Sequence, residues 1–420
     1  LSLALAAIML IGMMVVSASA VSYNDLTDKD QIVNKDAVSM LVTLGVIEGK
    51  PDGSYAPTEG VDRAQMAKMI SVIMNQGVDN GALYENSPSG LTDISSHWAK
   101  GHINYCYTTG IIAGRGNGTF DPSATVTALE AAKMLLVAVG YDPKIEGFEG
   151  ADWAINVSVR ADEQGIFEGF TKDLSAPLNR DDAALLIYNA LDVEMIQSYT
   201  TNNYPIVYSD HRTILSDKYG VIKVEGVVTA NEWAILDDDT DTALQEGKTR
   251  IYNPDGILST TGNTAVAQDS SANVKTQVFN VSTPVDMLGK AVTMYVKKTT
   301  ILADSTVYGA PVVSDVNTVI ETGEKVTGGD SKDDDSLAAL LKGTGLATDK
   351  ATEYYHNYEE VAIDSADVDD IMNVKGAALT VIDNDNDGYV NYVISVEKSL
   401  THVSGVSSKN ETTTLYGLPG

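Results

Sequence analysis

The first half of the chain repeats itself, and this internal repeat restricts the fold more than any other feature of the sequence. The segments GVIEG, GIIAG and GIFEG begin at Gly45, Gly110 and Gly165, and each is followed by a proline twelve residues after its first glycine. The tripeptide Ala-Lys-Met at 67–69 recurs at 132–134, at the same offset of 65 positions as the first two glycines. The third copy keeps the glycine-to-proline spacing but is three residues shorter after its proline. The sequence therefore predicts three copies of one structural unit.

The local signals within a unit predict two helices joined by a turn. Apolar residues at helical spacing end in the glycine, which is typical of a helix closed by a left-handed residue. The turn dipeptides Asp52-Gly53 and Asn117-Gly118 follow in the first two units. A second helix then begins with a capping oxygen three positions before an acid or an amide. The capping pairs are Asp62 with Gln65, Thr127 with Glu130, and Asn179 with Asp182. Because one such unit cannot bury its apolar stripe alone, we expect the three to pack together.

The repeated motifs resemble those of a known family. They are LTDI at 91–94, HWA at 97–99 and NGTFDP at 117–122 in the second copy, VDRAQ at 61–65 in the first, and WA at 153–154 with LNR at 178–180 in the third. On these motifs, about residues 22–195 resemble three tandem S-layer homology repeats of a bacterial cell-surface protein. The resemblance implies an all-α bundle with pseudo-threefold symmetry, whose grooves bind secondary cell-wall polysaccharide, typically a pyruvylated amino sugar.

The resemblance also implies which residues hold the acid group of that ligand. Arg63 and Arg180 occupy the arginine position of the family's motif at the start of the second helix, whereas the second repeat has Ala128 there. A planar guanidinium pairs with a carboxylate through two hydrogen bonds, and the N-terminus of a helix adds partial positive charge. We therefore expect two good grooves out of three. Without the resemblance, both arginines would read as ordinary exposed residues.

Four further residues belong to the candidate grooves. Gln65 and Glu130 lie in the same motif, and Trp98 and Trp153 lie near the start of the first helix of their repeats. The alternative for Gln65 and Glu130 is a helix-capping role, and for the two tryptophans a place in the core or in a groove wall.

Composition excludes some partners and favours others. The 420 residues include 58 acidic and 28 basic ones, for a net charge of −30, which argues against the phosphate backbone of nucleic acids as a partner. Residues 1–20 form an apolar run ending in SASA, the pattern of a secretory signal peptide whose start is clipped in this sequence. No later run is long enough to insert into a membrane. The single cysteine, Cys106, allows no intramolecular disulfide, which fits a Gram-positive-type envelope, and we expect it in the core.

The second half of the chain has a different pattern of residues. Short β-branched runs bounded by Gly, Asn and Asp predict a mainly β module, a sandwich or a small barrel, over 199–400, with an acidic linker near 327–335. Five residues between 224 and 232 recur 179 positions later, so that 401–420 would begin a second β module. The expected boundaries in the first half are 1–20 for the signal peptide and 21–85, 86–145 and 146–198 for the repeats. The fold class is therefore multidomain α+β.

One motif in the second half has the chemistry of a metal site. Asp383, Asp385 and Asp387 alternate along the segment DNDNDG, as in loops that wrap oxygen ligands around calcium. The position of the bidentate glutamate in an EF-hand is occupied by Ile394, and the flanking residues read as strands. The alternatives are a calcium loop between two strands and an acidic hairpin turn. The looser acidic cluster at 237–241 reads as a solvated turn.

Two classes of function fit these features. The first is a secreted, non-enzymatic S-layer or S-layer-associated protein. Its repeats would hold it on peptidoglycan-associated polysaccharide, and copies of it could self-assemble. The second is a wall-anchored hydrolase or adhesin whose active domain lies in or beyond the C-terminal half. The sequence contains no G-x-S-x-G or H-E-x-x-H motif and no plausible Cys/His pair, which favours the first class.

Overall fold

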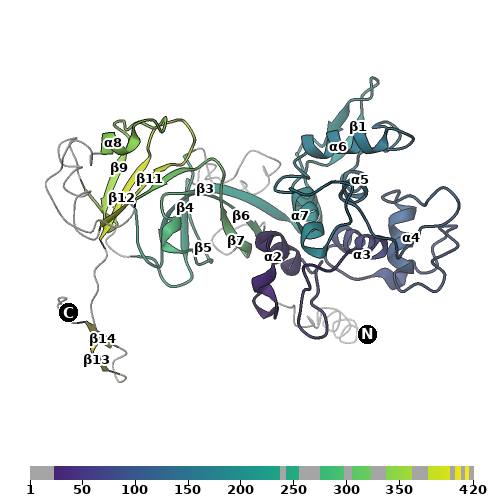
Figure 1. Ribbon diagram of the computed structural model, residues 1–420, viewed down its shortest axis with the longest axis horizontal. Helices are drawn as coiled ribbons and strands as arrows, with labels where there is room; N and C mark the ends of the chain where they lie inside the picture. Colours follow the sequence, from purple (N-terminus) through teal and green to yellow (C-terminus); the bar gives the residue numbers. More distant parts are fainter. Residues whose placement is uncertain are drawn as a thin grey trace, which may run out of the picture.

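The structure is a computed structural model. It describes residues 23–236, 243–254, 275–297, 305–322, 337–361 and 377–397, together with the backbone of 403–407 and 412–415. The expected signal peptide at 1–20, the acidic cluster at 237–241 and the acidic linker at 327–335 lie outside these described residues. Helices fill the first half of the chain and strands the second, as Figure 1 shows. The prediction of a multidomain α+β protein is confirmed. Within the described ranges, no helix is both long and apolar enough to cross a membrane.

Three helical pairs occupy the positions that the repeat predicts. Gly45, Gly110 and Gly165, which follow the first helices, all have positive φ, between 69° and 81°. The first helices are α2 (Lys35–Thr43), α4 (Lys100–Thr108) and α6 (Trp153–Glu163), and the second helices are α3 (Arg63–Met74), α5 (Ala128–Ala138) and α7 (Arg180–Leu191). Short helical turns lie at η1 (Tyr23–Asp25), η2 (Lys29–Gln31) and η3 (Gly81–Tyr84). The three pairs share one hydrophobic core, which includes Cys106 at 0% exposure.

A closed ring of backbone hydrogen bonds joins the three helical pairs. The amide of Val61 donates to Leu178, that of Val126 donates to Val61, and that of Leu178 donates to Val126, with N–O distances of 2.9–3.1 Å. All three side chains are buried. Because each residue lies two positions before the first residue of its second helix, the ring aligns the three helix N-termini around one pseudo-threefold axis.

The ring corrects one detail of the sequence alignment. The bridges that flank it pair Asp62 with Thr125, Thr127 with Pro177, and Asn179 with Gly60. Pro177 is therefore equivalent to Gly60 and Thr125. Its spacing from Gly165 had aligned it with Pro57 and Pro122 instead. The three-residue deletion lies before this point, in the loop that follows α6. Spacing from a glycine cannot detect a deletion when a proline happens to fall at the same interval.

The caps of the second helices differ between units. Asp62 with Gln65 and Thr127 with Glu130 form complete capping boxes, as the pattern predicts. In the third unit Asn179 caps the amide of Asp182, but the carboxylate of Asp182 binds Lys172 instead of closing the box.

The strands form two five-stranded sheets and two hairpins. The hairpins are β1 (Ile196–Tyr199) with β2 (Pro205–Val207), and β13 (Val403–Ser407) with β14 (Thr412–Leu415). The first large sheet has the antiparallel order β5 (Thr276–Phe279), β4 (Thr249–Tyr252), β3 (Val221–Asn231), β6 (Ala291–Lys297), β7 (Val307–Val313). The second has the order β10 (Glu359–Glu360), β9 (Glu353–His356), β12 (Tyr392–Glu397), β11 (Ala377–Asp383), β8 (Thr318–Glu321), in which β12 and β9 are parallel. The short turns η4 (Leu215–Tyr219) and η5 (Val285–Met287) and the helix α8 (Leu337–Leu341) complete the described elements.

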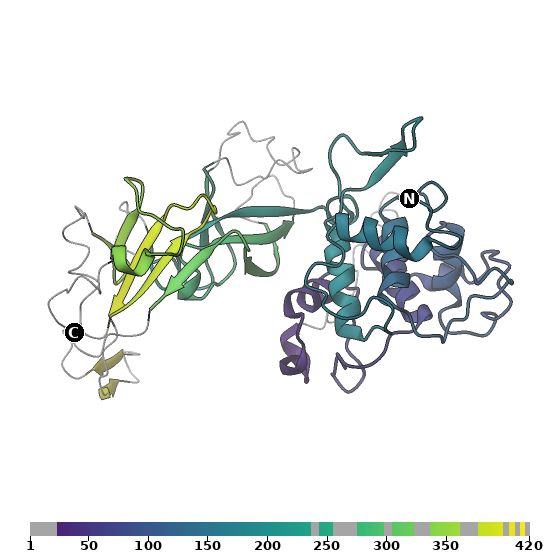
Figure 2. The ribbon, with the colours of Figure 1, turned by 45° about the horizontal axis from the view of Figure 1, so that its top comes forward.

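The two large sheets share a hydrophobic cluster, and no sheet closes into a barrel among the described strands. Strand β3 runs from the helical half into the first sheet, as both ribbon views show (Figures 1 and 2). Val221 at its start and Tyr295 of β6 belong to the core of the helical bundle, where Tyr295 meets Tyr188 of α7 edge to face. The bundle and the first sheet are therefore packed together and not merely tethered.

Candidate functional site

Arg63 is the centre of the first candidate groove, and it is buried rather than exposed. Its side chain is 6% exposed and lies over the ring of Phe120, 4.5 Å from the ring centre. Its Nε donates to the carbonyl of Phe120 at 3.0 Å and its Nη2 to that of Ala113 at 3.3 Å. Its Nη1 is 3.6 Å from Oε1 of Glu130. Unit 1 therefore inserts its arginine into unit 2, and the sequence-based alternative of an ordinary exposed residue is wrong for Arg63.

Arg180, which is half-buried, repeats two of these contacts between unit 3 and unit 1. Its guanidinium lies 4.9 Å from the ring centre of Tyr55, and its Nε donates to the carbonyl of Tyr55 at 2.8 Å. The hydroxyl of Tyr55 in turn donates to the carbonyl of Arg180 at 2.6 Å. Because Tyr55 and Phe120 are equivalent positions of the repeat, two of the three junctions have the same arginine–aromatic construction.

The third junction, between units 2 and 3, lacks both partners. Ala128 takes the place of the arginine, and Lys172 takes the place of the aromatic residue. The Lys172 Nζ is paired at 2.6 Å with Asp182 of its own unit, so the arginine–aromatic contact of the other two junctions has no counterpart at this one among the described residues.

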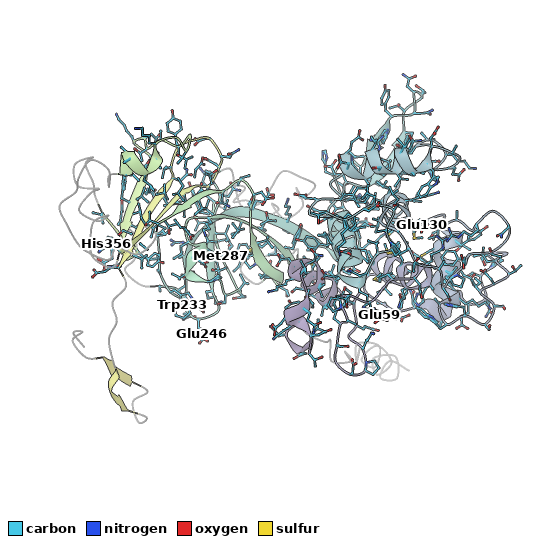
Figure 3. All side chains as sticks on the ribbon, viewed as in Figure 1. Glu59, Glu130, Trp233, Glu246, Met287 and His356 are labelled. Atoms are coloured by element: carbon cyan, nitrogen blue, oxygen red, sulfur yellow. The ribbon has the colours of Figure 1, made fainter. Side chains whose placement is uncertain are left out.

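A cavity of about 530 Å³ opens beside Arg63. Three cationic side chains line it, Arg63, Arg115 and Lys133, against two carboxylates, Glu130 and Glu149. The ring of Trp153, from the start of α6, forms part of the wall together with Phe148 and the 111–116 loop. Figure 3 shows Glu130 in the helical half, among side chains from several segments. An anionic ligand with an apolar face matches this lining.

Glu130 organises the cations of this cavity. Its Oε2 accepts the amide of Thr127 at 3.2 Å, and its Oε1 accepts from Arg115 at 3.0 Å. Lys133 donates to the carbonyl of Phe148 at 2.6 Å and lies 5.7 Å from the ring centre of Trp153. Burial lowers the pKa of Lys133 and of Arg63 from their ordinary values, and the nearby Arg115 lowers that of Arg63 further. The opposite charge of an incoming carboxylate would offset the cost of burying these cations.

The structure brings together three of the six predicted polysaccharide-binding residues, Arg63, Glu130 and Trp153, in this one cavity. Gln65 closes the capping box of α3 through its side-chain oxygen, 2.9 Å from the amide of Asp62. Trp98 is 59% exposed and stacks loosely on His97, with ring centres 5.5 Å apart. Trp98 is therefore a surface residue and not part of the core.

Sequence reasoning missed Arg115 and Lys133. A signal for both was present, because each has a basic counterpart 65 positions earlier, Lys50 and Lys68. The lysine of the Ala-Lys-Met repeat thus lines the cavity in the second unit, in addition to marking the periodicity.

A serine, a histidine and an aspartate also lie in line between units 1 and 2. Ser71 Oγ is 2.6 Å from Nδ1 of His102, and Nε2 of His102 is 3.2 Å from Asp79. Ser71 is 1% exposed in the middle of α3, so a substrate cannot reach its hydroxyl. The arrangement links α3 to α4, and burial lowers the pKa of His102, which favours the neutral ring.

Asp383, Asp385 and Asp387 converge as the DNDNDG segment predicts. One carboxylate oxygen from each lies within 4.8 Å of the others. Asp383 is 1% exposed, and its two oxygens accept the amides of Asn386 at 2.8 Å and Gly388 at 3.0 Å. Burial raises the pKa of Asp385, and repulsion from the carboxylates of Asp387 and Asp383 raises it further. The loop joins β11 to β12, so the expected position between two strands is confirmed.

Comparison with known proteins agrees with the geometry of the helical half. The S-layer homology domain model matches residues 22–67 and 90–132. A cell surface protein of Thermoanaerobacter kivui is 26% identical over 88% of this chain and 42% of its own length. An S-layer protein of Bacillus licheniformis is 34% identical over 27% of this chain and 12% of its own length. The chain thus spans less than half the length of either relative.

One further relative is named as an enzyme, and it resembles only part of this chain. An exoglucanase of Acetivibrio thermocellus is 27% identical over 41% of this chain and 16% of its own length. The likeness to this enzyme is confined to the S-layer homology region, whereas the Thermoanaerobacter kivui protein matches both halves. The helical half of the chain therefore carries S-layer homology domains, at residues 22–67 and 90–132.

Proposed function

We propose that the chain anchors a bacterial surface protein non-covalently to secondary cell-wall polysaccharide, as part of an S-layer or an S-layer-associated structural protein. The observation that carries this proposal is the cavity beside Arg63, where one buried cation, two more accessible ones and the ring of Trp153 come together next to the two matched segments. The relatives named as S-layer and cell surface proteins support the same location at the wall.

The finer parts of the proposal concern the third unit and the ligand. We infer that α6 and α7 form a third repeat, because Leu178, two positions before α7, completes the backbone ring with Val61 and Val126. A ligand with a carboxylate, as in a pyruvylated sugar, suits the cations around Arg63 better than a neutral sugar does. The equivalent arginine–aromatic contact at Arg180 supports a second groove, and two weak grooves on one polymer give avidity.

The test is co-sedimentation of the full chain with purified cell walls. In an Arg115→Gln/Lys133→Gln variant, which leaves the buried Arg63 in place, we expect binding to fall about tenfold, because two charged hydrogen-bond donors are lost. Adding Arg180→Gln should lower it by a further tenfold or more, since avidity is lost with the second groove. Walls stripped of secondary polymer should retain little of the wild-type protein. Walls from which only the pyruvate ketal is removed should bind the wild-type protein as weakly as intact walls bind the triple variant.

The matched control is Arg160→Gln. Arg160 also lies over an aromatic ring, that of Tyr141, and pairs with Glu146 and Glu163, but it is outside the cavity. Its replacement should leave wall binding unchanged. Equal binding by the triple variant and the wild type, or full binding to stripped peptidoglycan, would refute the proposed grooves.

We also propose calcium as the ligand of Asp383, Asp385 and Asp387. Extracellular calcium modules bind with dissociation constants of about 0.1–1 mM. Addition of 10 mM calcium should therefore raise the free energy of unfolding of the β module by roughly 1.5–3 kcal/mol. Thermal unfolding with calcium and with EDTA measures this shift. An Asp385→Asn/Asp387→Asn variant should lose it, and Glu397→Gln, which neutralises a carboxylate of β12 outside the loop, should keep it. An equal shift in both variants would assign the effect to other carboxylates.

Self-assembly into a layer belongs to the structural role and is tested by electron microscopy of the full-length protein. The runner-up, a wall-anchored hydrolase, is supported by the likeness to an exoglucanase, but this likeness is confined to the S-layer homology region. An active domain attached to the same anchor would appear as hydrolysis of wall glycans by the full-length protein.

A further inference from the structure

We propose that the β half of the chain contains a second, independent ligand site, which binds a neutral mono- or disaccharide unit. The site is a cavity of about 350 Å³ between the two five-stranded sheets. It is separate from the groove at Arg63, which lies within the helical bundle, so this proposal does not depend on the proposed anchoring function.

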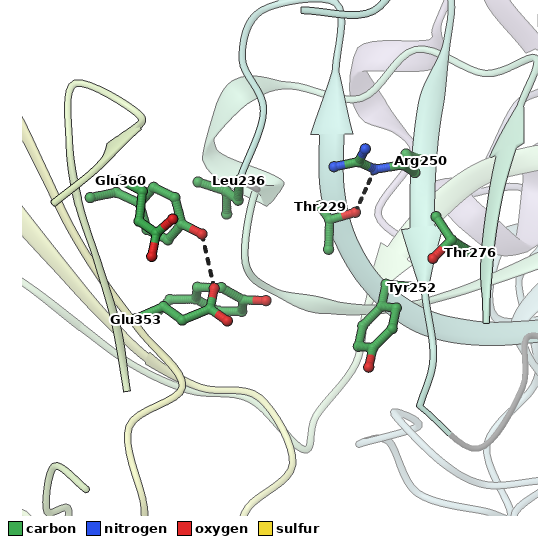
Figure 4. Close-up of a pocket in the computed structure, with 9 residues that line it drawn as sticks. Thr229, Leu236, Arg250, Tyr252, Thr276, Glu353 and Glu360 are labelled. Atoms are coloured by element: carbon green, nitrogen blue, oxygen red, sulfur yellow. Dashed lines mark hydrogen bonds between the residues drawn. The ribbon is translucent and has the colours of Figure 1, made fainter. Parts of the chain in front are cut away.

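The strands place polar groups on facing walls of this cavity. Arg250 and Tyr252, two positions apart on β4, point to the same side of their sheet, and so do Glu353 and Tyr355 on β9. Figure 4 shows Arg250 and Tyr252 on one wall and Glu353 and Glu360 on the other.

Neighbouring hydroxyls hold two of the charged groups in place. Nε of Arg250 donates to Oγ1 of Thr229 at 2.9 Å, and the hydroxyl of Tyr355 donates to Oε2 of Glu353 at 2.9 Å. Tyr355 is 1% exposed and Thr229 is 7% exposed, so both supports are themselves fixed by packing. A site whose polar groups are already oriented loses little conformational entropy on binding.

The aromatic walls favour a ligand with flat apolar faces. Tyr355 and Tyr392 lie side by side, with ring centres 6.1 Å apart and planes inclined by 45°, and Tyr252 faces them from the other sheet. A pyranose ring presents C–H groups on its faces and hydroxyls around its edge. The hydroxyls can accept hydrogen bonds from Arg250 and donate to the carboxylates at the same time. The volume suits one or two such rings.

The charges argue against two other ligand classes. One guanidinium faces two carboxylates, Glu353 and Glu360, in a chain of net charge −30, so an acidic sugar would be repelled. A short peptide would match the opposite charges, but among the described lining residues Leu236 is the only aliphatic one, and the remaining apolar lining consists of tyrosine rings, which suit the flat face of a sugar better than an aliphatic side chain. A neutral saccharide is not repelled by the carboxylates and does not need an aliphatic pocket, so it fits the lining of the cavity better than the other two classes.

The experiment is a titration of the full chain followed by ligand-observed NMR and calorimetry. The probes are glucose, galactose, mannose, N-acetylglucosamine, cellobiose and lactose, with glucuronic acid and the dipeptide Gly-Ala as the competing classes. We expect saturable binding of at least one neutral saccharide, with a dissociation constant on the order of 1 mM. Glu360→Gln and Arg250→Lys should each weaken it about tenfold, because the first removes a charged acceptor and the second replaces the planar fork of guanidinium donors by a single ammonium group.

The matched control is Glu359→Gln, the same charge change at the neighbouring residue of β10, which does not line the cavity. It should bind as the wild type does. Both Glu359 and Glu360 are exposed, so neither change should unfold the module. The proposal fails if no neutral saccharide saturates the protein by about 20 mM, if only glucuronic acid or the dipeptide binds, or if both cavity variants bind unchanged. An Arg115→Gln/Lys133→Gln variant should keep this binding even where it loses the wall.

Discussion

Replacing Phe120 by alanine should lower the free energy of unfolding of the helical bundle by about 3–5 kcal/mol. Phe120 is 0% exposed, and its ring supports the guanidinium of Arg63 at 4.5 Å. The substitution removes a large side chain from a packed junction and also removes a cation–π contact. Urea unfolding followed by the helical circular dichroism signal measures the loss. Binding to cell walls should fall with it, because Arg63 loses the surface on which it lies.

The matched control for Phe120→Ala is Trp98→Ala. Trp98 is also a large aromatic residue of the second unit, but it is 59% exposed. Its removal should change the free energy of unfolding by no more than about 0.5 kcal/mol. Similar losses in the two variants would mean that the arginine–aromatic junction does not hold the bundle together.

Gly101→Ala should destabilise the same bundle by roughly 3 kcal/mol, at the upper end of the range for overpacking. Gly101 lies in the first turn of α4, where alanine would normally favour the helix. A Cβ at this position would stand 1.8 Å from the carbonyl oxygen of Gly81 in η3. Because that neighbour is backbone, relief requires α4 and η3 to move apart. Thermal unfolding measures the loss.

The matched control for Gly101→Ala is Gly110→Ala, at the end of the same helix. Gly110 has φ of 81° and open space around its Cβ position, so alanine would be strained by the backbone angle alone, at a cost of about 1–2 kcal/mol. A loss at Gly101 no larger than that at Gly110 would contradict the close approach of α4 to η3.

Local sequence was enough to predict the helical units. The glycines after the first helices and the capping pairs at Asp62 and Thr127 are signals carried by residues at most a few positions apart, and the structure has helices with these ends. The calcium-type loop was found in the same way, since its three aspartates lie within five residues. The mainly β character of the second half also follows from short runs of β-branched residues.

Contacts between distant segments decided what the sequence left open. The equivalence of Pro177 with Gly60 became visible only through the ring of hydrogen bonds between units. Arg63 was expected as a ligand residue, but its burial over Phe120, 57 positions away, depends on the packing of unit 1 against unit 2. Arg115 and Lys133 joined the candidate site for the same reason.

The cavity between the two sheets had no signature in the sequence. Arg250 and Glu353 lie more than a hundred residues apart, on strands of different sheets, and neither belongs to a recognisable motif. Secondary structure depends on near neighbours, because hydrogen bonds and caps act over one or two turns of chain. A binding site depends on which faces the core brings together, and only the packing of the whole chain determines that.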